Sequence, residues 1–391
     1  MKNGDSKPVP NTILKSIRVQ NYRSLRDVTL YFRPLTIIVG PNASGKSNCL
    51  AALWLLGRMM SAPELPSRTY IKDNLWIDGA KEISFDVDLE CAGKAAHYSL
   101  SIAPTRRKTP VKKESLSIAG TEVISVNNGK GFVCNEDGSE SIPYQGVQLA
   151  LKSAGSYGDR PITNAVAQFI QDWEFYDVDP SFIRGEMSRL QFDSLEQSGR
   201  LDRRGLALSP FLSHWAARDP AVLRSINEGM RVCGGTELEI SGGRNKKLHL
   251  EEGLSKTLPL DHASDGTLRL LFYNALSYQP NLPSLIGIEE PERNLHPAAL
   301  VQLGQLLEQL ARKTQVIITT HSSQLVDCFS VDNLSKDLAV ILLRKQAAQG
   351  TEALSVDKIR SEREALQDWM NDFGIGNAIF HSQLLQDLVG S

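Results

Sequence analysis

Cysteine is scarce in this sequence, and the few cysteines lie far apart. The chain has 391 residues and 5 cysteines, with no C-x-x-C pair and no histidine at zinc-ligand spacing from them. They are Cys49, Cys91, Cys134, Cys233 and Cys328. Scattered cysteines are typical of proteins in a reducing compartment. The pattern therefore argues against a structural zinc site and favours a cytoplasmic location.

Long hydrophobic runs and a strong net charge are also missing. No apolar segment approaches the roughly 20 residues that span a bilayer, and residues 1–12 are polar, unlike a secretion signal. The net charge is −2, so contact with nucleic acid would need a local basic patch. With 41% hydrophobic and 23% charged residues, the composition is that of an ordinary soluble protein. We expect two or three lobes and no membrane partner.

A glycine-rich segment at residues 40–47 lies between a predicted strand, residues 35–39, and a predicted helix, residues 48–60. In this context the backbone N–H groups close around an oligophosphate, and the dipole of the helix adds positive potential. Lys46 would reach the β and γ phosphates, and the Ser47 hydroxyl would take one Mg²⁺ position. The sequence therefore predicts a nucleoside triphosphate site that contains Gly40, Pro41, Asn42, Ala43, Ser44, Gly45, Lys46, Ser47 and Asn48.

Two adjacent carboxylates follow a predicted buried strand at residues 284–288. In doubly wound sheets this edge is where ligands bind, and a buried acidic pair needs a cation to share its charge. We assign Glu289 to the Mg²⁺ shell, through water, and Glu290 to the attacking water. The alternative is an exposed acidic turn, which the apolar Leu-Ile-Gly-Ile run before the pair makes less favourable.

Two further segments are predicted to face phosphate. His321 ends the next buried strand, and although a lone histidine is usually structural, the other two motifs favour a γ-phosphate contact. Ser264, Asp265 and Gly266 precede a helix that begins near Leu268, where a hydroxyl and backbone N–H groups form an anion site. An ordinary helix N-cap explains these residues equally well.

The arrangement of motifs resembles the ATP-binding-cassette (ABC) class, and most closely the RecF/SMC-like, non-transporter AAA-family ATPases of bacteria (AAA_21 type). The resemblance is carried by the order and spacing of five segments. These are residues 40–47, 263–267, 288–291, 294–297 and 320–322. Residues 19–25 and 173–176 are also typical of that group. The similarity covers most of the chain and is weakest between residues 105 and 160.

The resemblance implies an α/β ABC-type ATPase head, with a mostly parallel sheet, flanking helices and an antiparallel β lobe. An α-rich arm or lid subdomain would be inserted into this head. We assign residues 1–105 to the N-terminal half of the head and 106–255 to the insertion. Residues 256–353 would form the C-terminal half, and 354–391 a helical tail.

The resemblance also implies that two copies pack head to tail with ATP and Mg²⁺ between them. Ser264 and Gly266 of one copy would then touch the γ-phosphate that Lys46 of the other copy holds. Arg23 matches an arginine near the nucleotide, and Asn294 lies in the loop that crosses the dimer interface. Hydrolysis would proceed by positioning and charge neutralisation, so it should depend on dimerisation.

Two departures from the cassette pattern affect the metal site. Most members have aspartate before the catalytic glutamate, where this chain has Glu289. No glutamine occurs between Asn48 and Tyr144, so the glutamine loop that joins Mg²⁺ to the arm is missing from its usual place. Metal coordination would then need another residue or water.

The partners are suggested only by weak signals. Basic clusters occur at Arg106-Arg107-Lys108 with Lys112-Lys113, at Arg200 with Arg203-Arg204, and at Arg244 with Lys246-Lys247. They suit a DNA backbone across the dimer, although solvated loop charge is the more frequent explanation of any one cluster. The tail after the last predicted strand is too short for a Toprim nuclease domain, so a separate effector would cleave nucleic acid.

Three functional hypotheses follow from this sequence. The first is an ATP-driven switch or motor on DNA, in phage defence or repair beside an effector. The second is an ATP-dependent scaffold that regulates a toxin or nuclease without acting on DNA. The third, a transporter ATPase subunit, is disfavoured by the missing glutamine loop.

Overall fold

The chain folds as two compact units. The computed structural model describes residues 11–77, 79–106, 109–154, 160–185, 200–232, 237–241, 247–251, 257–279, 281–346, 348–362 and 364–381. The first unit comprises residues 1–173 and 335–362, and the second comprises 174–334 and 363–391. Within the described ranges, no helix has the length and apolar character that crossing a membrane requires.

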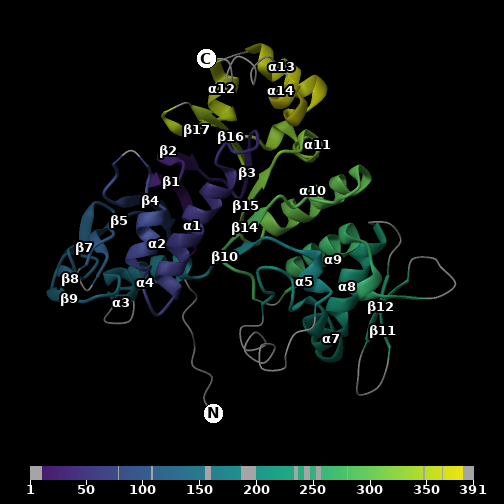
Figure 1. Cartoon of the computed structure of the whole chain (residues 1–391), viewed down its shortest axis with the longest axis horizontal. Helices are drawn as coiled ribbons and strands as arrows, with labels where there is room; N and C mark the ends of the chain where they lie inside the picture. The colour runs from purple at the N-terminus through teal and green to yellow at the C-terminus, as the bar shows by residue number, and fades with distance from the viewer. Residues whose placement is uncertain are drawn as a thin grey trace. The chain divides into compact units, whose positions relative to one another are not determined.

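The first unit contains an eight-stranded antiparallel sheet in the order β2-β1-β4-β5-β6-β7-β8-β9 (Figure 1). Its strands are β1 (Thr12–Tyr22), β2 (Leu25–Tyr31), β4 (Ile83–Cys91), β5 (Lys94–Ile102), β6 (Val111–Ile118), β7 (Thr121–Asn127), β8 (Lys130–Cys134) and β9 (Ser141–Gln145). In β4 every second residue is buried, as its alternating sequence predicts. The predicted boundary at residues 105 and 106 lies between β5 and β6, so the sheet continues into the segment that we assigned to the insertion.

A second group of strands in this unit positions the glycine-rich loop. The fully buried β3 (Leu35–Val39) pairs in parallel with β16 (Leu338–Gln346), which pairs antiparallel with β17 (Gly350–Ser355). The helices are α1 (Lys46–Ser61), α2 (Arg68–Asp73), α3 (Ala150–Ala154), α4 (Pro161–Gln171) and α12 (Val356–Glu362). Strand, loop and helix thus follow one another from β3 to α1 as predicted.

A buried carboxylate joins the antiparallel sheet to α3. The side chain of Glu114 on β6 has an exposed fraction of 0% and accepts hydrogen bonds from the backbone N–H groups of Ala150 at 2.7 Å and Leu151 at 2.9 Å. The hydroxyl of Tyr98 donates to the same carboxylate at 3.0 Å. Burial raises the pKa of Glu114 to about 7, against the lowering effect of these hydrogen bonds.

The second unit has β10 (Trp173–Tyr176), whose first residue belongs to the first unit, and the parallel pair β14 (Leu285–Glu289) and β15 (Gln315–Thr320). Gly287 lets β10 approach β14, since a Cβ there would lie 2.3 Å from Cδ1 of Phe175. A separate antiparallel sheet contains β11 (Glu237–Ser241), β12 (Lys247–Glu251) and β13 (Leu258–Pro259). The helices include α5 (Pro180–Ile183), α7 (Leu208–Arg218), α8 (Pro220–Val232), α9 (Asp265–Tyr278), α10 (Pro297–Ala311), α11 (Ser323–Val326), α13 (Glu364–Phe373) and α14 (Ile375–His381).

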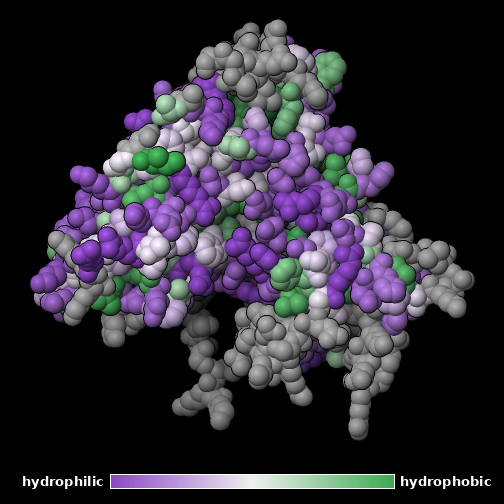
Figure 2. Space-filling view, viewed as in Figure 1, coloured by the Kyte–Doolittle hydropathy of each residue, from purple (hydrophilic) through white to green (hydrophobic). Residues whose placement is uncertain are grey.

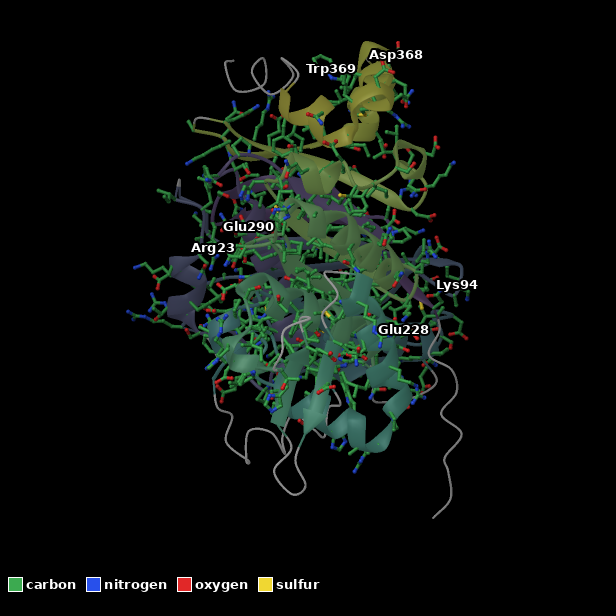
Figure 3. All side chains as sticks on the ribbon, turned by 90° about the vertical axis from the view of Figure 1, so that its right-hand side faces the viewer. Arg23, Lys94, Glu228, Glu290, Asp368 and Trp369 are labelled. Atoms are coloured by element: carbon green, nitrogen blue, oxygen red, sulfur yellow. The ribbon has the colours of Figure 1, made fainter. Side chains whose placement is uncertain are left out.

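Exposed apolar side chains are few on the described surface. The face in Figure 2 is mostly hydrophilic, with small separate groups of hydrophobic residues. The largest exposed aromatic pair is on α13, where Trp369 and Phe373 have exposed fractions of 39% and 62%. Figure 3 shows Trp369 beside Asp368 on this helix.

Candidate functional site

The glycine-rich loop of the first unit has the shape that phosphate binding requires. Gly40, Ala43 and Gly45 have φ angles of 157°, 62° and 110°, which turn the backbone N–H groups inward. The Nζ of Lys46 donates to the carbonyl oxygens of Gly40 at 2.8 Å and Pro41 at 3.0 Å. The ammonium is therefore buried within the loop, while the side chain of Ser47 is exposed. These residues fit a nucleoside triphosphate and its Mg²⁺.

Two distant residues, Ser24 and Thr351, together with Asn48 at the end of the loop, fix its conformation by hydrogen bonds. Thr351 Oγ1 on β17 donates to the carbonyl oxygen of Ser44 at 2.9 Å and lies 2.8 Å from Ser24 Oγ. The side-chain amide of Asn48 donates to the same Ser24 hydroxyl at 2.8 Å. The loop conformation is thus fixed by a continuous chain of hydrogen bonds. Sequence reasoning missed Ser24 and Thr351, because the pairing of β16 with β17 brings Thr351 to the loop.

Arg23 lies on the turn between β1 and β2, beside the start of α1. Its φ angle is 51°, and its Nε donates to Asn74 Oδ1 at 2.7 Å. Its Nη1 lies 3.4 Å from Asn48 Oδ1. The structure therefore brings the two predicted nucleotide-binding residues Arg23 and Asn48 together, and the Arg23 side chain is exposed.

The acidic pair of the second unit lies at the carboxyl end of β14, as predicted. Glu289 is the last strand residue, and Glu290 turns away with a φ of 43°. The Glu290 carboxylate lies 3.0 Å from Nη2 of Arg293 and 3.2 Å from Nδ1 of His321. Because β14 and β15 are parallel, Glu290 and His321 follow strand ends at the same edge. The structure thus brings two of the predicted catalytic residues into contact.

A third carboxylate in this cluster was not predicted from the sequence. Glu292 is 8% exposed and accepts a hydrogen bond from Thr320 Oγ1 at 2.5 Å. Its Oε1 lies 3.9 Å from Nδ1 of His321. Burial raises the pKa of Glu292, and the hydrogen bond from Thr320 opposes that rise. The sequence does show a carboxylate two residues after Glu290, but the hydrophobic pattern around it does not predict that this side chain is buried.

The segment before α9 contacts the loop that contains Asn294. Ser264 is the N-cap of α9, accepting a hydrogen bond from the N–H of Thr267 at 3.1 Å, and it remains exposed. Asp265 accepts from Nδ2 of Asn294 at 3.2 Å. A Cβ on Gly266 would lie 2.9 Å from the carbonyl oxygen of Asn294. The structure therefore brings Ser264, Asp265, Gly266 and Asn294 together, with Ser264 in the capping role.

The predicted residues thus form two groups, one on each unit. The loop residues with Arg23 and Asn48 belong to the first, and Glu289, Glu290, His321 and the Ser264 segment belong to the second. Across the described ranges, no group of three or more histidine, cysteine or acidic side chains is arranged to hold a metal ion. Mg²⁺ in nucleotide sites takes one or two protein ligands beside substrate phosphates. Ser47 and Glu289 remain the predicted ligands.

Two families match this chain, and together they cover much of it. Residues 149–327 match the family described as "AAA domain, putative AbiEii toxin, Type IV TA system". Residues 13–117 match the family described as "AAA ATPase domain". The "OLD nuclease" of Thermus scotoductus is 33% identical over 109 residues, or 24% of this chain. That match spans only 20% of the nuclease, about a fifth of its length.

Solved structures share the fold at low sequence identity. An SMC head bound to the C-terminal winged-helix domain of ScpA has a TM-score of 0.55 and 15% identity, covering 88% of this chain and 99% of that one. An SMC head with an extended coiled coil, bound to the C-terminal domain of ScpA derived from Pyrococcus furiosus, has a TM-score of 0.53 and 14% identity. It covers 91% of this chain and 100% of the other.

These structures confirm the predicted fold class, an α/β ABC-type ATPase head. The two family matches add the AAA sequence signature in both halves of the chain. The chain thus matches AAA family models in both of its halves and has the fold of SMC heads, which supports the predicted resemblance to ABC-class, RecF/SMC-like AAA ATPases.

Proposed function

We propose that this chain binds and hydrolyses ATP with Mg²⁺, and that two copies pack head to tail around the nucleotide. The observation that carries the proposal is the buried ammonium of Lys46, held by loop carbonyls at 2.8 and 3.0 Å. An ammonium buried within a glycine-rich loop, in which the backbone N–H groups turn inward, lies where an oligophosphate would bind. ATP supplies that oligophosphate.

The second unit supplies the groups for hydrolysis. Glu290 would orient and deprotonate the attacking water, because its carboxylate is held in place by Arg293 and His321. His321 would contact the γ-phosphate through its exposed imidazole. Mg²⁺, held by Ser47 and Glu289, would neutralise charge on the transferred phosphoryl group.

Dimerisation is supported by the exposure of Ser264 at the start of α9. A helix N-terminus with an exposed hydroxyl suits the γ-phosphate of an ATP molecule held by a second copy. The contacts of Asp265 and Gly266 with Asn294 would couple this segment to the interface loop. Each site would then be complete only in the dimer.

The first biological role that we propose is a switch or motor on DNA, in phage defence or DNA repair, beside a separate effector. The similarity to an OLD nuclease supports a nucleic-acid context. Of the predicted basic clusters, Arg107, Lys108, Arg244 and Lys246 lie outside the described residues. Arg200 donates to the carbonyl oxygens of Asn281 at 2.9 Å and Leu282 at 3.4 Å.

The second role is an ATP-dependent scaffold that regulates a toxin or nuclease partner. It is favoured by the matching family, whose description names a putative toxin. The SMC heads solved with a bound ScpA domain support a protein partner for this fold. Stimulation of ATP turnover by duplex DNA is expected only for the first role, so its measurement separates the two.

The ATPase assignment is tested with two variants and two matched controls. Lys46→Ala should abolish ATP binding, whereas Glu290→Gln should retain it and lose turnover by at least about 100-fold. Lys72→Ala and Glu228→Gln remove the same charges at exposed positions and should leave turnover unchanged.

Mass measurement of the Glu290→Gln variant with and without ATP tests dimerisation. We expect a dimer only in the presence of ATP, because hydrolysis no longer reverses it. Full turnover in either Lys46→Ala or Glu290→Gln would refute the site, and an ATP-bound monomer would refute the shared arrangement.

A further inference from the structure

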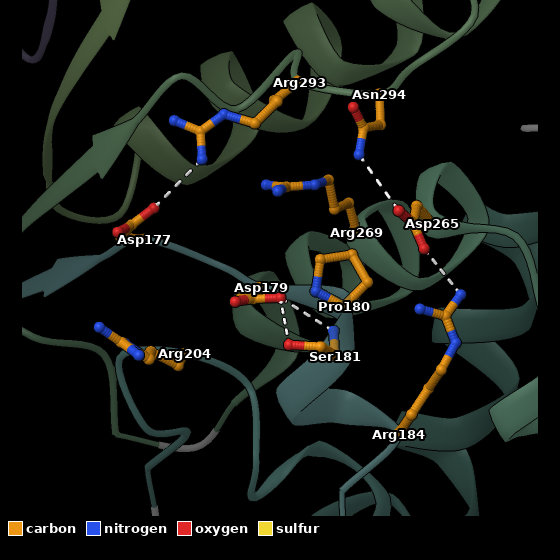
Figure 4. A pocket seen from close by; sticks show the side chains of 10 residues that line it. All are labelled: Asp177, Asp179, Pro180, Ser181, Arg184, Arg204, Asp265, Arg269, Arg293 and Asn294. Atoms are coloured by element: carbon orange, nitrogen blue, oxygen red, sulfur yellow. Dashed lines mark hydrogen bonds and ion pairs between the residues drawn. The ribbon is translucent and has the colours of Figure 1, made fainter.

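A polar pocket in the second unit is lined by four arginines. Its volume is about 330 Å³, at the lower end of the range for small-molecule sites. Figure 4 shows the guanidinium of Arg269 entering the pocket between Arg293 and Asp179. We call this the arginine pocket. Its walls come from the end of β10, from α5, from the start of α9 and from the loop after β14.

The buried arginine of this pocket has two nitrogens without a hydrogen-bond partner among the described residues. Arg269 is only 3% exposed, yet its Nε and Nη1 have no partner among the described residues. A buried guanidinium with unused donors costs free energy, because it has lost water without replacing it. Native proteins rarely retain such a group without a reason. The unused donors therefore indicate a ligand that the protein itself does not supply.

The carboxylates of the pocket are mostly engaged by other groups. Asp265 pairs with Arg184 at 2.7 Å, and Asp177 lies 3.6 Å from Arg293. Asp179 accepts hydrogen bonds from the N–H of Ser181 at 2.9 Å and its hydroxyl at 2.6 Å. These hydrogen bonds lower the pKa of Asp179, with smaller contributions from nearby arginines.

The remaining charge of the pocket is positive. Arg184 and Arg293 are paired with carboxylates, which leaves Arg269 and Arg204 facing Asp179 without a hydrogen bond to it. The guanidinium carbon of Arg204 lies 4.8 Å from the ring centroid of Phe182, a cation–π contact that restricts the position of the side chain. Two guanidinium groups that line the same pocket offer many hydrogen-bond donors. A phosphate group, with its several oxygens, can accept more of these hydrogen bonds than a single carboxylate can.

We propose that the arginine pocket binds a phosphate group, either free or at the end of a larger ligand, with Arg269 and Arg204 as its donors. This goes beyond the proposed ATPase function, since neither arginine belongs to the residues assigned to ATP. Asp265 and Asn294 form part of the wall, so an occupied pocket would lie next to the segment that starts α9.

The test is calorimetric titration of the full chain with inorganic phosphate in phosphate-free buffer. Lys46→Ala removes the competing loop site and should retain binding. Arg269→Gln should weaken binding by at least about tenfold, the loss expected for one charge-assisted hydrogen bond. Arg224→Gln, an exposed arginine on α8, is the control and should bind as the wild type does.

The opposite pattern would overturn the proposal. If Lys46→Ala loses the binding and Arg269→Gln keeps it, the phosphate site is the glycine-rich loop alone. Absence of wild-type binding at millimolar phosphate also contradicts it.

Thermal unfolding separates ligand binding from a structural role of Arg269. Without phosphate, Arg269→Gln should be at least as stable as the wild type, because an unpaired buried charge is removed. A large drop in Tm would reveal an internal partner and would refute the argument. Phosphate should raise the Tm of the wild type and leave that of Arg269→Gln unchanged.

The source of the phosphate is identified with two oligonucleotides. A short thymidine oligonucleotide with a 5′-phosphate should bind to the Lys46→Ala variant, and the same strand with a 5′-hydroxyl should not. Tighter binding of the phosphorylated strand than of inorganic phosphate points to a strand end, and the reverse order points to a free anion. Equal binding of both strands would contradict recognition of a terminal phosphate.

Discussion

Glu114 gives the first unit a pH dependence that can be measured directly. Burial raises its pKa from an ordinary value of 4.5 to about 7 in the folded protein. Between these two values the folded state holds a proton that the unfolded state has released. The associated stability is present below pH 4.5 and is lost as the pH rises through about 7. The shift corresponds to about 3 kcal/mol, at 1.36 kcal/mol for each pH unit.

Replacing Glu114 by glutamine should remove this dependence. Glutamine is neutral at every pH, so the difference in unfolding free energy between wild type and Glu114→Gln should change by about 3 kcal/mol between pH 4.5 and 8. The variant also loses one acceptor for the N–H groups of α3, which lowers its stability at all pH values by about 1–3 kcal/mol.

Urea unfolding followed by circular dichroism measures both effects on the Glu114→Gln variant. The control is Glu122→Gln, which removes an exposed carboxylate on β7 and so measures the effect of losing one negative charge without burial. Parallel pH profiles for the wild type and Glu114→Gln would refute the assignment of the titrating group.

Three further substitutions test other parts of the structure. Gly45→Ala should lower the free energy of unfolding and the affinity for ATP, because the φ of Gly45 is +110° and a Cβ there would lie 2.3 Å from Thr351 Oγ1. The control is Gly93→Ala, since Gly93 has a φ of +76° but open space around it. This control measures the backbone strain alone, which is about 1–3 kcal/mol, without the steric clash. Glu292→Gln should lower kcat on the order of tenfold with little change in KM for ATP, since its carboxylate helps to position His321, the residue after β15. A tenfold rise in KM would contradict this role. Asp327→Ala should lower local stability by about 1–2 kcal/mol, because its carboxylate accepts from two backbone N–H groups and one side-chain amide at the start of α14. Amide hydrogen exchange of α14 measures this change, and unchanged protection would exclude the capping role.

Sequence reasoning succeeded where the signal is local. The apolar run of β3 followed by glycines predicted the loop, and the apolar runs of β14 and β15 placed Glu289 and His321 at strand ends. Such patterns depend on a few neighbouring residues. They do not depend on which distant segments meet in the fold.

The remaining features depend on tertiary contacts that no local pattern contains. Thr351 reaches the loop because β17 pairs with β16, and the pairing of β16 with β3 was not deducible from either strand alone. Glu292 and Arg269 look like ordinary surface charges in the sequence, and only the fold buries them. The four arginines of the arginine pocket come from separate segments, so their convergence follows from packing rather than spacing.

The pairing of β3 with β16 also sets an order for biosynthesis. Val39 pairs with Leu342, so the ribosome adds about 300 residues, over roughly 15 to 60 s, between these two paired positions of β3 and β16. Residues 174–334, the larger part of the second unit, are synthesised during that interval. The first unit therefore completes its fold only after residues 174–334 of the second have been translated, and a nascent chain shortened before Thr351 would lack the hydrogen bond that supports the nucleotide loop. ATP binding should consequently appear only after Thr351 has been translated.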